Sequence, residues 1–203
     1  ARPRRLLHEA TIGGRLRRGR NSLLDGRMVS APPDRIAFDR GVLTRVREAD
    51  VADFIGAAAA NAERLREWIP WGDDPAYRRE RIGGAPVDWE RHRAYLYALR
   101  QSDDGAVIGG FSLHRRVGPD GLEIGYWLDT AHTGAGLATE AVGVLTAVAL
   151  ALPEVERVEI HTDEGNTRSA AVPRRLGYRL ARVDAFEVRT GSETGRLQIW
   201  VTP

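Results

Sequence analysis

The spacing of hydrophobic residues in the first half of the chain predicts one strand followed by short helices. Residues 41–47 are rich in apolar and β-branched side chains, which is typical of a strand. Asp50 then stands at an N-cap position, and apolar residues recur at helical spacing over 51–58. A second apolar stripe over 62–69 ends before a proline, so it predicts another short helix. Residues 72–93 are charged and interrupted by glycine and proline, which predicts a broken helix.

The second half of the chain has the pattern of a sheet with two helices. Turn sequences rich in glycine, proline and aspartate separate its apolar segments. The strand, helix and strand expected between 122 and 162 form a unit whose crossover is long enough for a parallel pair. The expected strands are 94–100, 106–115, 122–128, 157–162, 178–185 and 195–201, and the expected helices are 137–152 and 167–176.

Length and composition favour one domain preceded by a leader. The chain has 203 residues, of which 42% are hydrophobic, and this is enough for the core of a single domain over 41–203. Residues 30–34 have the composition of a linker, so 1–40 is expected to be a flexible leader or extension. No window holds the ~18 uninterrupted apolar residues of a membrane span, and no secretory signal is visible. We therefore expect a soluble, cytoplasmic protein with no membrane partner.

The basic residues are concentrated near the N-terminus. Residues 1–27 hold eight arginines and two acidic residues, a net charge of +6, whereas the remaining 22 arginines and 26 acidic residues give −4. A basic segment of this kind is able to bind nucleic acid or the ribosome. The alternative is a disordered or non-native leader, because the single methionine, Met28, stands where the basic segment ends.

Two absent residue types exclude several kinds of chemistry. The chain has no cysteine, which excludes disulfides, thiol nucleophiles and thiolate metal sites. All thirty basic residues are arginine, so Schiff-base chemistry is excluded as well. The five histidines are scattered and show no metal-ligand spacing, so we expect no metal ion.

A glycine loop between an expected strand and an expected apolar helix is the clearest candidate binding site. Residues 133–138 are Thr-Gly-Ala-Gly-Leu-Ala. Glycines allow a tight turn with exposed N–H groups, and the helix N-terminus adds its positive dipole end, so the loop suits a pyrophosphate. The alternative is a turn that serves packing only. A P-loop is excluded because the chain has no lysine, and the dinucleotide-binding motif fails because Thr139 replaces its last glycine or alanine.

Glu123 is the candidate general base. Within 122–128, strand alternation places Glu123, Gly125 and Trp127 on one face. An ionised carboxylate is costly to bury among apolar residues, so we expect the pKa of Glu123 to be raised. A carboxylate with a raised pKa is suited to take a proton from an amine, directly or through water. The alternative is an exposed carboxylate near the start of a strand.

Two further pairs of residues are candidates for ligand contacts. Asn166 precedes the expected helix 167–176, where its side chain either caps the helix or bonds an extended ligand that crosses the sheet. Ser169, one turn later, offers a hydroxyl toward the same space. Trp68 and Trp71 lie at a helix end, where they either pack in the core or form a wall of the substrate site.

Taken in order, these segments resemble the GNAT acyltransferases. They are more closely similar to the RimJ/RimL-type subgroup, which acetylates N-terminal amines of ribosomal proteins and includes small-molecule acyltransferases. The resemblance covers about 41–203 and rests on the ordered set of segments rather than on one motif. The matching segments are Leu43 to Trp71 with its Trp-x-Pro-Trp, Glu-Ile-Gly-Tyr-Trp-Leu at 123–128, Thr-Gly-Ala-Gly-Leu-Ala-Thr-Glu-Ala at 133–141, Asn-Thr-Arg-Ser at 166–169 and Arg-Leu-Gly-Tyr at 175–178.

The resemblance implies a mixed α/β fold with a central, mostly antiparallel seven-stranded sheet flanked by helices. Its parallel pair, expected at 122–128 and 157–162, would be splayed to admit the pantetheine arm of an acyl-coenzyme A. Acetyl-CoA or another acyl-CoA would be the co-substrate, without a metal ion. Relatives in the subgroup are often homodimers, so a homodimer is one expectation for this chain.

The resemblance also assigns roles to individual residues. The glycine loop would hold the coenzyme pyrophosphate, although Thr133 and Ala135 stand where the family often has Gln or Arg and a basic residue. Glu123 matches a position often assigned as base, and Ser169 matches a proposed general acid at the thiolate. The residues expected to bind the coenzyme are Trp127, Leu128, Asp129, Thr133, Gly134, Ala135, Gly136, Leu137, Ala138 and Asn166.

The resulting hypothesis is direct transfer of an acetyl or other short acyl group to a primary amine. The acceptor would be a peptide N-terminus or a small amine, bound beside Trp68 and Trp71, and the net charge of −4 favours a cationic one. A backbone N–H of 122–128 would hold the oxyanion. The alternative is a nucleic-acid or ribosome-associated binding module that uses 1–27 and keeps a degenerate acyl-CoA site.

Overall fold

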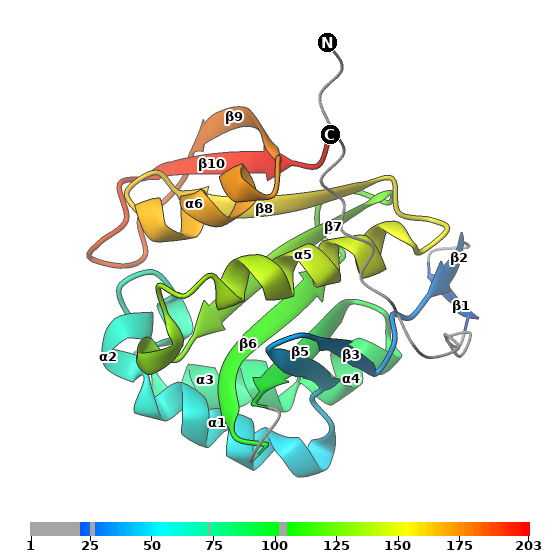
Figure 1. The fold of residues 1–203 in the computed structure, drawn as a ribbon, viewed down its shortest axis with the longest axis horizontal. Coiled ribbons are helices and arrows are strands. Elements are labelled where there is room, and N and C mark those ends of the chain that lie inside the picture. Colours follow the sequence, from blue (N-terminus) through cyan, green and yellow to red (C-terminus); the bar gives the residue numbers. More distant parts are fainter. Residues whose placement is uncertain (1–20, 25–26, 73, 102–104) are drawn as a thin grey trace.

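The structure, a computed structural model, describes residues 21–24, 27–72, 74–101 and 105–203. It contains strands and helices in the mixed order that the sequence predicts (Figure 1). The strands are β1 (Asn21–Leu24), β2 (Arg27–Ser30), β3 (Arg35–Phe38), β4 (Gly41–Arg45), β5 (Ala94–Arg100), β6 (Val107–His114), β7 (Gly121–Leu128), β8 (Arg157–Asp163), β9 (Arg179–Ala185) and β10 (Arg196–Val201). The α-helices are α1 (Val51–Ala60), α2 (Ala62–Leu65), α3 (Pro75–Gly83), α4 (Ala85–Glu90), α5 (Leu137–Leu150) and α6 (Thr167–Arg175). Three 3₁₀ turns are η1 (Glu48–Asp50), η2 (Pro70–Gly72) and η3 (Thr130–His132).

Eight of the described strands form one mostly antiparallel sheet in the order β3-β4-β5-β6-β7-β8-β10-β9. Within it β7 and β8 are paired in parallel, and α5 connects them across one face of the sheet (Figure 1). The crossover helix therefore follows from the strand–helix–strand pattern. Strands β1 and β2 form a separate antiparallel hairpin.

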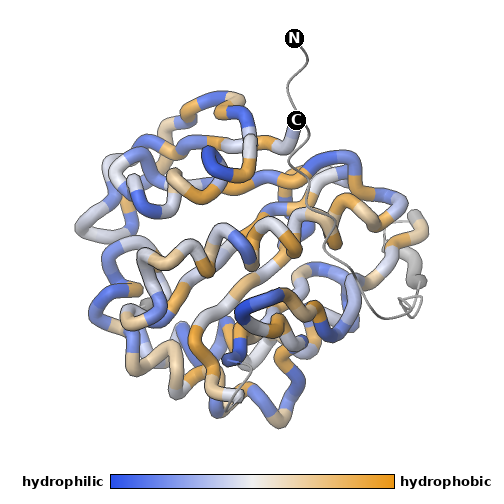
Figure 2. The backbone as a smooth tube through the Cα atoms, viewed as in Figure 1, coloured by the Kyte–Doolittle hydropathy of each residue, from blue (hydrophilic) through white to orange (hydrophobic). Residues whose placement is uncertain are grey.

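The core lies on both faces of this sheet because alternate side chains of each strand point to opposite sides. On β5, Tyr95, Tyr97 and Leu99 pack into the cluster that includes the buried face of α5. Ala98 points the other way, into a second cluster that includes Phe54 of α1. Figure 2 shows hydrophobic segments along α5 and the central strands, with hydrophilic segments frequent in the outer loops. No helix in the described ranges combines the length and apolar character that crossing a bilayer requires.

The sequence predictions from residue 94 onward are confirmed to within two residues at each end. The broken helix over 72–93 is also confirmed, as α3 and α4 separated at Gly84. Asp74 caps α3 by accepting the N–H groups of Ala76 and Tyr77 at 2.8 and 3.0 Å. The bounds of α3 and α4 therefore follow from the cap at Asp74 and the interruption at Gly84.

Two expectations about the first half are wrong. The sheet has eight strands rather than seven, because β3 pairs with β4 and so lies inside the segment 1–40 that was assigned to the leader. Four residues are too few to show a readable period, which explains the omission. Asp50 occupies the N-cap position of α1 as expected, but its side chain does not cap the helix and instead accepts the N–H of Arg47 at 3.0 Å. Of the basic segment 1–27, all but Asn21–Leu24 and Arg27 lies outside the described residues.

Candidate active site

The parallel strands β7 and β8 separate after three residue pairs. Their register runs from Gly121 opposite Arg157 to Glu123 opposite Glu159 and ends there, although both strands continue. A cavity of about 1430 Å³ opens between them and extends to the glycine loop and α6. The splayed parallel pair expected from the sequence is therefore present. Beyond Glu123, the edge of β7 that faces β8 has no strand partner in the described chain.

The glycine loop begins α5 at one end of this cavity. Gly134 and Gly136 have φ angles of +85° and +82°, a left-handed conformation that glycine adopts without steric cost. Both glycines are exposed and line the cavity, and a smaller cavity of about 620 Å³ adjoins them between α5 and α6. The loop therefore presents the first N–H groups of a long helix to open space, which is the geometry that binds anions.

A cation reaches the glycine loop from a distant part of the sequence. Arg40, in the turn between β3 and β4, donates from Nη1 to the carbonyl of Ala135 at 2.7 Å and from Nε to Glu140 at 2.6 Å. A Cβ atom on Gly136 would lie 3.7 Å from Nη2 of Arg40. The loop itself has no basic side chain, so Arg40 brings positive charge to it. No local motif could have placed Arg40 there, because the contact spans about a hundred residues of sequence.

The N-terminus of α6 brings Asn166 and Ser169 to another border of the cavity. Asn166 caps the helix, accepting the N–H of Ser169 at 3.1 Å. The hydroxyl of Ser169 lies 3.0 Å from that of Tyr126, and Tyr126 donates to the carbonyl of Ser169 at 2.9 Å. Burial raises the pKa of Tyr126, and the hydrogen bond with Ser169 opposes this, so the phenol stays neutral at ordinary pH. The hydroxyl of Ser169 is thus held next to a second hydroxyl beside the cavity.

Glu123 lies in the cavity but does not have the expected raised pKa. Its side chain is 7% exposed, and Arg116 donates to both carboxylate oxygens at 2.6 Å. Burial acts to raise the pKa of Glu123, but the hydrogen bonds and charge of Arg116, with smaller effects of His161 and His114, lower it below its ordinary value of 4.5. The expectation is wrong because Arg116, in the turn that precedes β7, folds back onto Glu123, a contact that the strand pattern did not predict. Glu123 is therefore an ionised carboxylate at neutral pH.

A buried serine and a partly buried histidine stand beside Glu123, and sequence analysis did not single them out. Ser112 and His114 on β6 pair with Gly125 and Glu123 on β7. The hydroxyl of Ser112 lies 2.9 Å from Nε2 of His114, and both residues line the cavity. The alternation within 106–115 places Ser112 and His114 on one face of the strand, but only the pairing with β7 shows that this face borders the cavity. No group of three or more potential metal ligands is found among the residues that the structure describes.

Residues 40–179 match the family model described as "Acetyltransferase (GNAT) domain". The chain belongs to the GNAT acetyltransferase family. This membership agrees with the resemblance drawn from the ordered segments, and it does not support the alternative of a nucleic-acid-binding module.

Relatives of this GNAT chain include proteins named for ribosomal substrates. The chain is 34% identical over 126 residues to YdaF of Bacillus subtilis (strain 168), which is provisionally named a ribosomal N-acetyltransferase. The matched region covers 58% of this chain and 66% of YdaF, just under two thirds of that relative. RimJ of Mycobacterium smegmatis, solved with a coenzyme A disulfide, has a TM-score of 0.73 at 21% identity and covers 85% of this chain and 89% of RimJ. A RimL structure, titled a ribosomal L7/L12 α-N-protein acetyltransferase in complex with coenzyme A, has a TM-score of 0.72 at 20% identity over 82% and 96% of the two chains. At these identities the solved structures show the shared fold.

The end of β7 in this GNAT domain has side chains with structural roles. Trp127 is buried edge-to-face against Phe54, with ring centroids 5.7 Å apart, and Leu128 is buried in the core. The carboxylate of Asp129 accepts from Asn61 and from the N–H of Ala131, both at 2.9 Å. Burial acts to raise the pKa of Asp129, but these hydrogen bonds lower it overall. Contacts of these three residues with a coenzyme would therefore come from the backbone.

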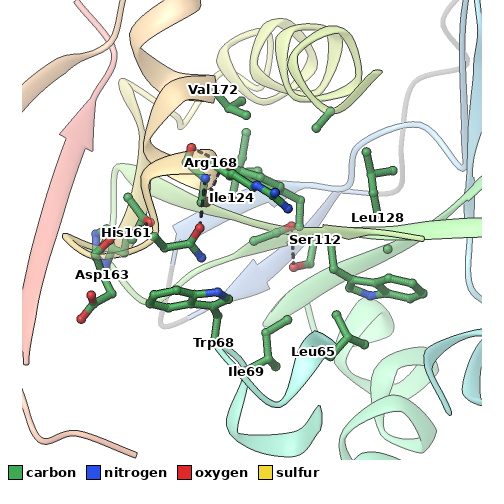
Figure 3. A pocket seen from close by; sticks show the side chains of 18 of the residues that line it. Leu65, Trp68, Ile69, Ser112, Ile124, Leu128, His161, Asp163, Arg168 and Val172 are labelled. Carbon is green, nitrogen blue, oxygen red and sulfur yellow. Dashed lines mark hydrogen bonds between the residues drawn. The ribbon is translucent and has the colours of Figure 1, made fainter. Parts of the chain in front are cut away.

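The remaining predicted residues line the same cavity or support it. Trp68 and Trp71 are partly buried and border the cavity, and Trp71 also packs against the second hydrophobic cluster. Figure 3 shows Leu65, Trp68 and Ile69 on one side of the pocket and Arg168 and Val172 of α6 on another, with Ser112 between them. Thr133 and Ala138 line the cavity, and Leu137 is buried at the start of α5.

Proposed function

We propose that this protein transfers an acetyl group from acetyl-CoA to a primary amine, and that the cavity between β7 and β8 holds both substrates. The observation that carries the proposal is the early separation of the two strands. Because the strands separate early, one cavity extends from the glycine loop to the titratable groups beside Glu123. Family membership supports acetyl transfer, and a coenzyme A disulfide in the RimJ structure supports the donor.

The coenzyme is expected to bind along the unpaired edge of β7. Its pyrophosphate would accept hydrogen bonds from the N–H groups of the loop at 134–138, with Arg40 adding charge. Arg175 borders both cavities beside the loop and is a second candidate for a phosphate contact. The pantetheine arm would add an extended segment beside β7, where backbone groups past Glu123 lack a strand partner among the described residues.

The reaction follows from the groups around the wedge, which is the space between β7 and β8 beyond Glu123 and Glu159. An acceptor ammonium group first loses one proton to solvent, because only the neutral amine has a lone pair. The neutral nitrogen then attacks the thioester carbonyl carbon and forms a C–N bond. The nitrogen loses its second proton, and the C–S bond breaks as the carbonyl re-forms. A backbone N–H of β7 beyond Glu123 would hold the oxyanion of the tetrahedral intermediate. Ser169 would give its proton to the departing thiolate and recover one from the adjacent hydroxyl network with Tyr126 or from solvent.

Glu123 would act as a fixed negative charge in this reaction. Its lowered pKa keeps it ionised, so it favours the approach of an acceptor ammonium group toward the cavity. The acceptor side of the cavity also carries arginines, among them Arg81 and Arg116, so its charge is mixed. We propose a peptide N-terminus as acceptor, because YdaF is named for ribosomal N-acetyl transfer and RimL is titled a ribosomal L7/L12 α-N-protein acetyltransferase. A small-molecule amine is the alternative.

A thiol-release assay tests the proposed function. The protein would be mixed with acetyl-CoA and, in separate wells, with N-terminal peptides of ribosomal proteins, lysine-containing peptides blocked at the N-terminus, and small amines. Free coenzyme A in the peptide wells, with an acetyl group on the peptide α-amine by mass spectrometry, is the expected result. Release of coenzyme A only in the wells with small amines would show that the acceptor is a small amine rather than a peptide N-terminus. No release of coenzyme A with any amine would refute the proposed acetyl transfer.

A further inference from the structure

Ser112 and His114 form a small polar site on the cavity face of β6. In the antiparallel register Ser112 stands opposite Gly125, and His114 stands opposite Glu123. The hydroxyl of Ser112 lies 2.9 Å from Nε2 of His114 and 3.3 Å from the carbonyl oxygen of Gly125. The hydroxyl proton is therefore able to move between two acceptors without movement of the backbone.

Gly125 leaves this site open toward the wedge. A Cβ atom on Gly125 would lie 3.0 Å from the hydroxyl oxygen of Ser112 and 3.8 Å from Nε2 of His114. Any side chain at 125 would therefore stand over the hydroxyl. Glu123 is the last residue of β7 that pairs with β8, and Gly125 lies two positions beyond it. The opening therefore lies where β7 and β8 have already separated.

The surroundings of His114 keep its ring uncharged. Burial, followed by the positive charge of Arg116, lowers the pKa of His114 to about 4, with Arg81 of α3 acting in the same direction. Glu123 of β7 and Asp88 of α4 oppose this shift. At neutral pH the imidazole is therefore in its proton-accepting form, and a carboxylate stands nearby to stabilise the protonated form once it is made.

We infer that Ser112 and His114 together accept the proton that the acceptor amine loses during acyl transfer. This inference rests on the proposed function. As the C–N bond forms, the nitrogen gives a proton to the hydroxyl oxygen of Ser112, and that hydroxyl passes its own proton to Nε2 of His114. The C–S bond then breaks, and the thiolate takes a proton from Ser169. His114 returns its proton to solvent through the cavity, so that protons and charges balance over one cycle.

This assignment differs from a base role for Glu123. Both oxygens of Glu123 accept hydrogen bonds from Arg116, whereas Ser112 is the single hydrogen-bond partner of His114 in the described part of the chain. The nitrogen bonded to the tetrahedral carbon is more acidic than a free ammonium group, and His114, with a pKa of about 4, passes the proton on to solvent at neutral pH. The charge of Glu123 then stabilises the imidazolium rather than receiving the proton.

Kinetics of matched variants test the inference. We expect His114→Ala to lower kcat about a hundredfold at pH 7, with the KM for acetyl-CoA changed less than twofold, and Ser112→Ala to lower kcat about tenfold. The control is His92→Asn, because His92 is a buried histidine that contacts Tyr95 away from the cavity. Added imidazole should restore part of the activity of His114→Ala and leave the control unchanged.

The possible outcomes separate this inference from the proposed function. If His114→Ala and Ser112→Ala each keep kcat within threefold of the parent, the inference is overturned while acetyl transfer stands. If His114→Ala does not fold, Ser112→Ala tests the inference alone, because it removes a single oxygen atom and is expected to fold. An unchanged kcat of Ser112→Ala would then refute proton transfer through Ser112 to His114. If the parent releases no thiol with any amine, the proposed function fails and the inference fails with it.

Discussion

Glu123 and Glu159 are the last residues at which β7 and β8 are paired, and both carboxylates are buried. Each is held by an arginine, Arg116 for Glu123 and Arg157 for Glu159, at 2.6 and 2.9 Å. His161 lies near both, with Nε2 2.7 Å from Glu159 and Nδ1 3.6 Å from Glu123. Two like charges are thus compensated at the point where the sheet opens, and the wedge beyond them forms the cavity.

The glycine loop gives the first prediction. Gly134→Ala should weaken acetyl-CoA binding about tenfold, because its new methyl group would point into the space at the helix N-terminus where the phosphates are expected. Gly177→Ala is a matched control, since Gly177 also has a left-handed φ, +79°, and also has open space around its Cβ position. Both variants should lose about 1–2 kcal/mol of unfolding free energy. Equal affinities of the two variants, measured by isothermal titration, would contradict the phosphate assignment.

Arg40 gives the second prediction. Arg40→Ala should raise the Kd for acetyl-CoA about tenfold, the size expected for one partly exposed charge-assisted contact. The affinity of the parent should fall as salt is added, and the variant should show a weaker salt dependence. Arg182→Ala, which removes an exposed arginine bonded to Asp184 on β9, is the control. An Arg40→Ala protein that binds as tightly as this control would show that Arg40 only braces the loop.

The third prediction concerns the stability of the protein in acid. The pKa of Glu123 is lowered in the folded state, so its ion pair with Arg116 contributes stability above pH 4.5 and loses it as the pH falls through the folded pKa. Glu123→Gln should therefore cost about 1–3 kcal/mol of unfolding free energy at pH 7, and this cost should shrink as the pH falls below 4.5. Glu48→Gln, at an exposed carboxylate, is the control. A difference from the parent that stays constant with pH would contradict the lowered pKa.

The fourth prediction concerns the departing thiolate. Ser169→Ala should lower kcat about tenfold without changing the affinity for acetyl-CoA, because it removes the proposed proton donor and no phosphate contact. Tyr126→Phe should have a smaller effect, since the hydroxyl of Ser169 remains but loses its neighbour. Steady-state kinetics on both variants check this. A larger loss in Tyr126→Phe than in Ser169→Ala would make the tyrosine, rather than the serine, the donor.

Much of the fold follows from local patterns. The apolar run that ends at Pro153 and the glycine before Leu137 bound α5, and the turn sequences that separate apolar segments predict β5, β6 and β7. Strand β3 was missed because four residues hold too little periodicity, and its pairing with β4 is decided by the buried side chain of Ile36. Local signals therefore predict the long elements, whereas short edge strands depend on tertiary contacts.

The site was predicted less completely than the fold. Motif order indicated the glycine loop, Asn166 and Glu123, because these lie in continuous segments. The state of Glu123 depends on Arg116, which is seven residues away in sequence and folds back across a turn. Arg40 reaches the loop from the other end of the domain, and His114 is recognisable only once Gly125 lies opposite Ser112. Charge states and long-range partners thus required the folded structure.

Hydrogen–deuterium exchange with and without acetyl-CoA tests the central claim that the wedge is the coenzyme site. Acetyl-CoA should slow exchange in two segments: residues 124–129, along the unpaired edge of β7, and residues 134–140, at the start of α5. Exchange in β9 and β10, on the far side of β8, should stay unchanged. Binding of acetyl-CoA that leaves both segments unprotected would contradict the account, because the coenzyme would then lie outside the space between β7 and β8.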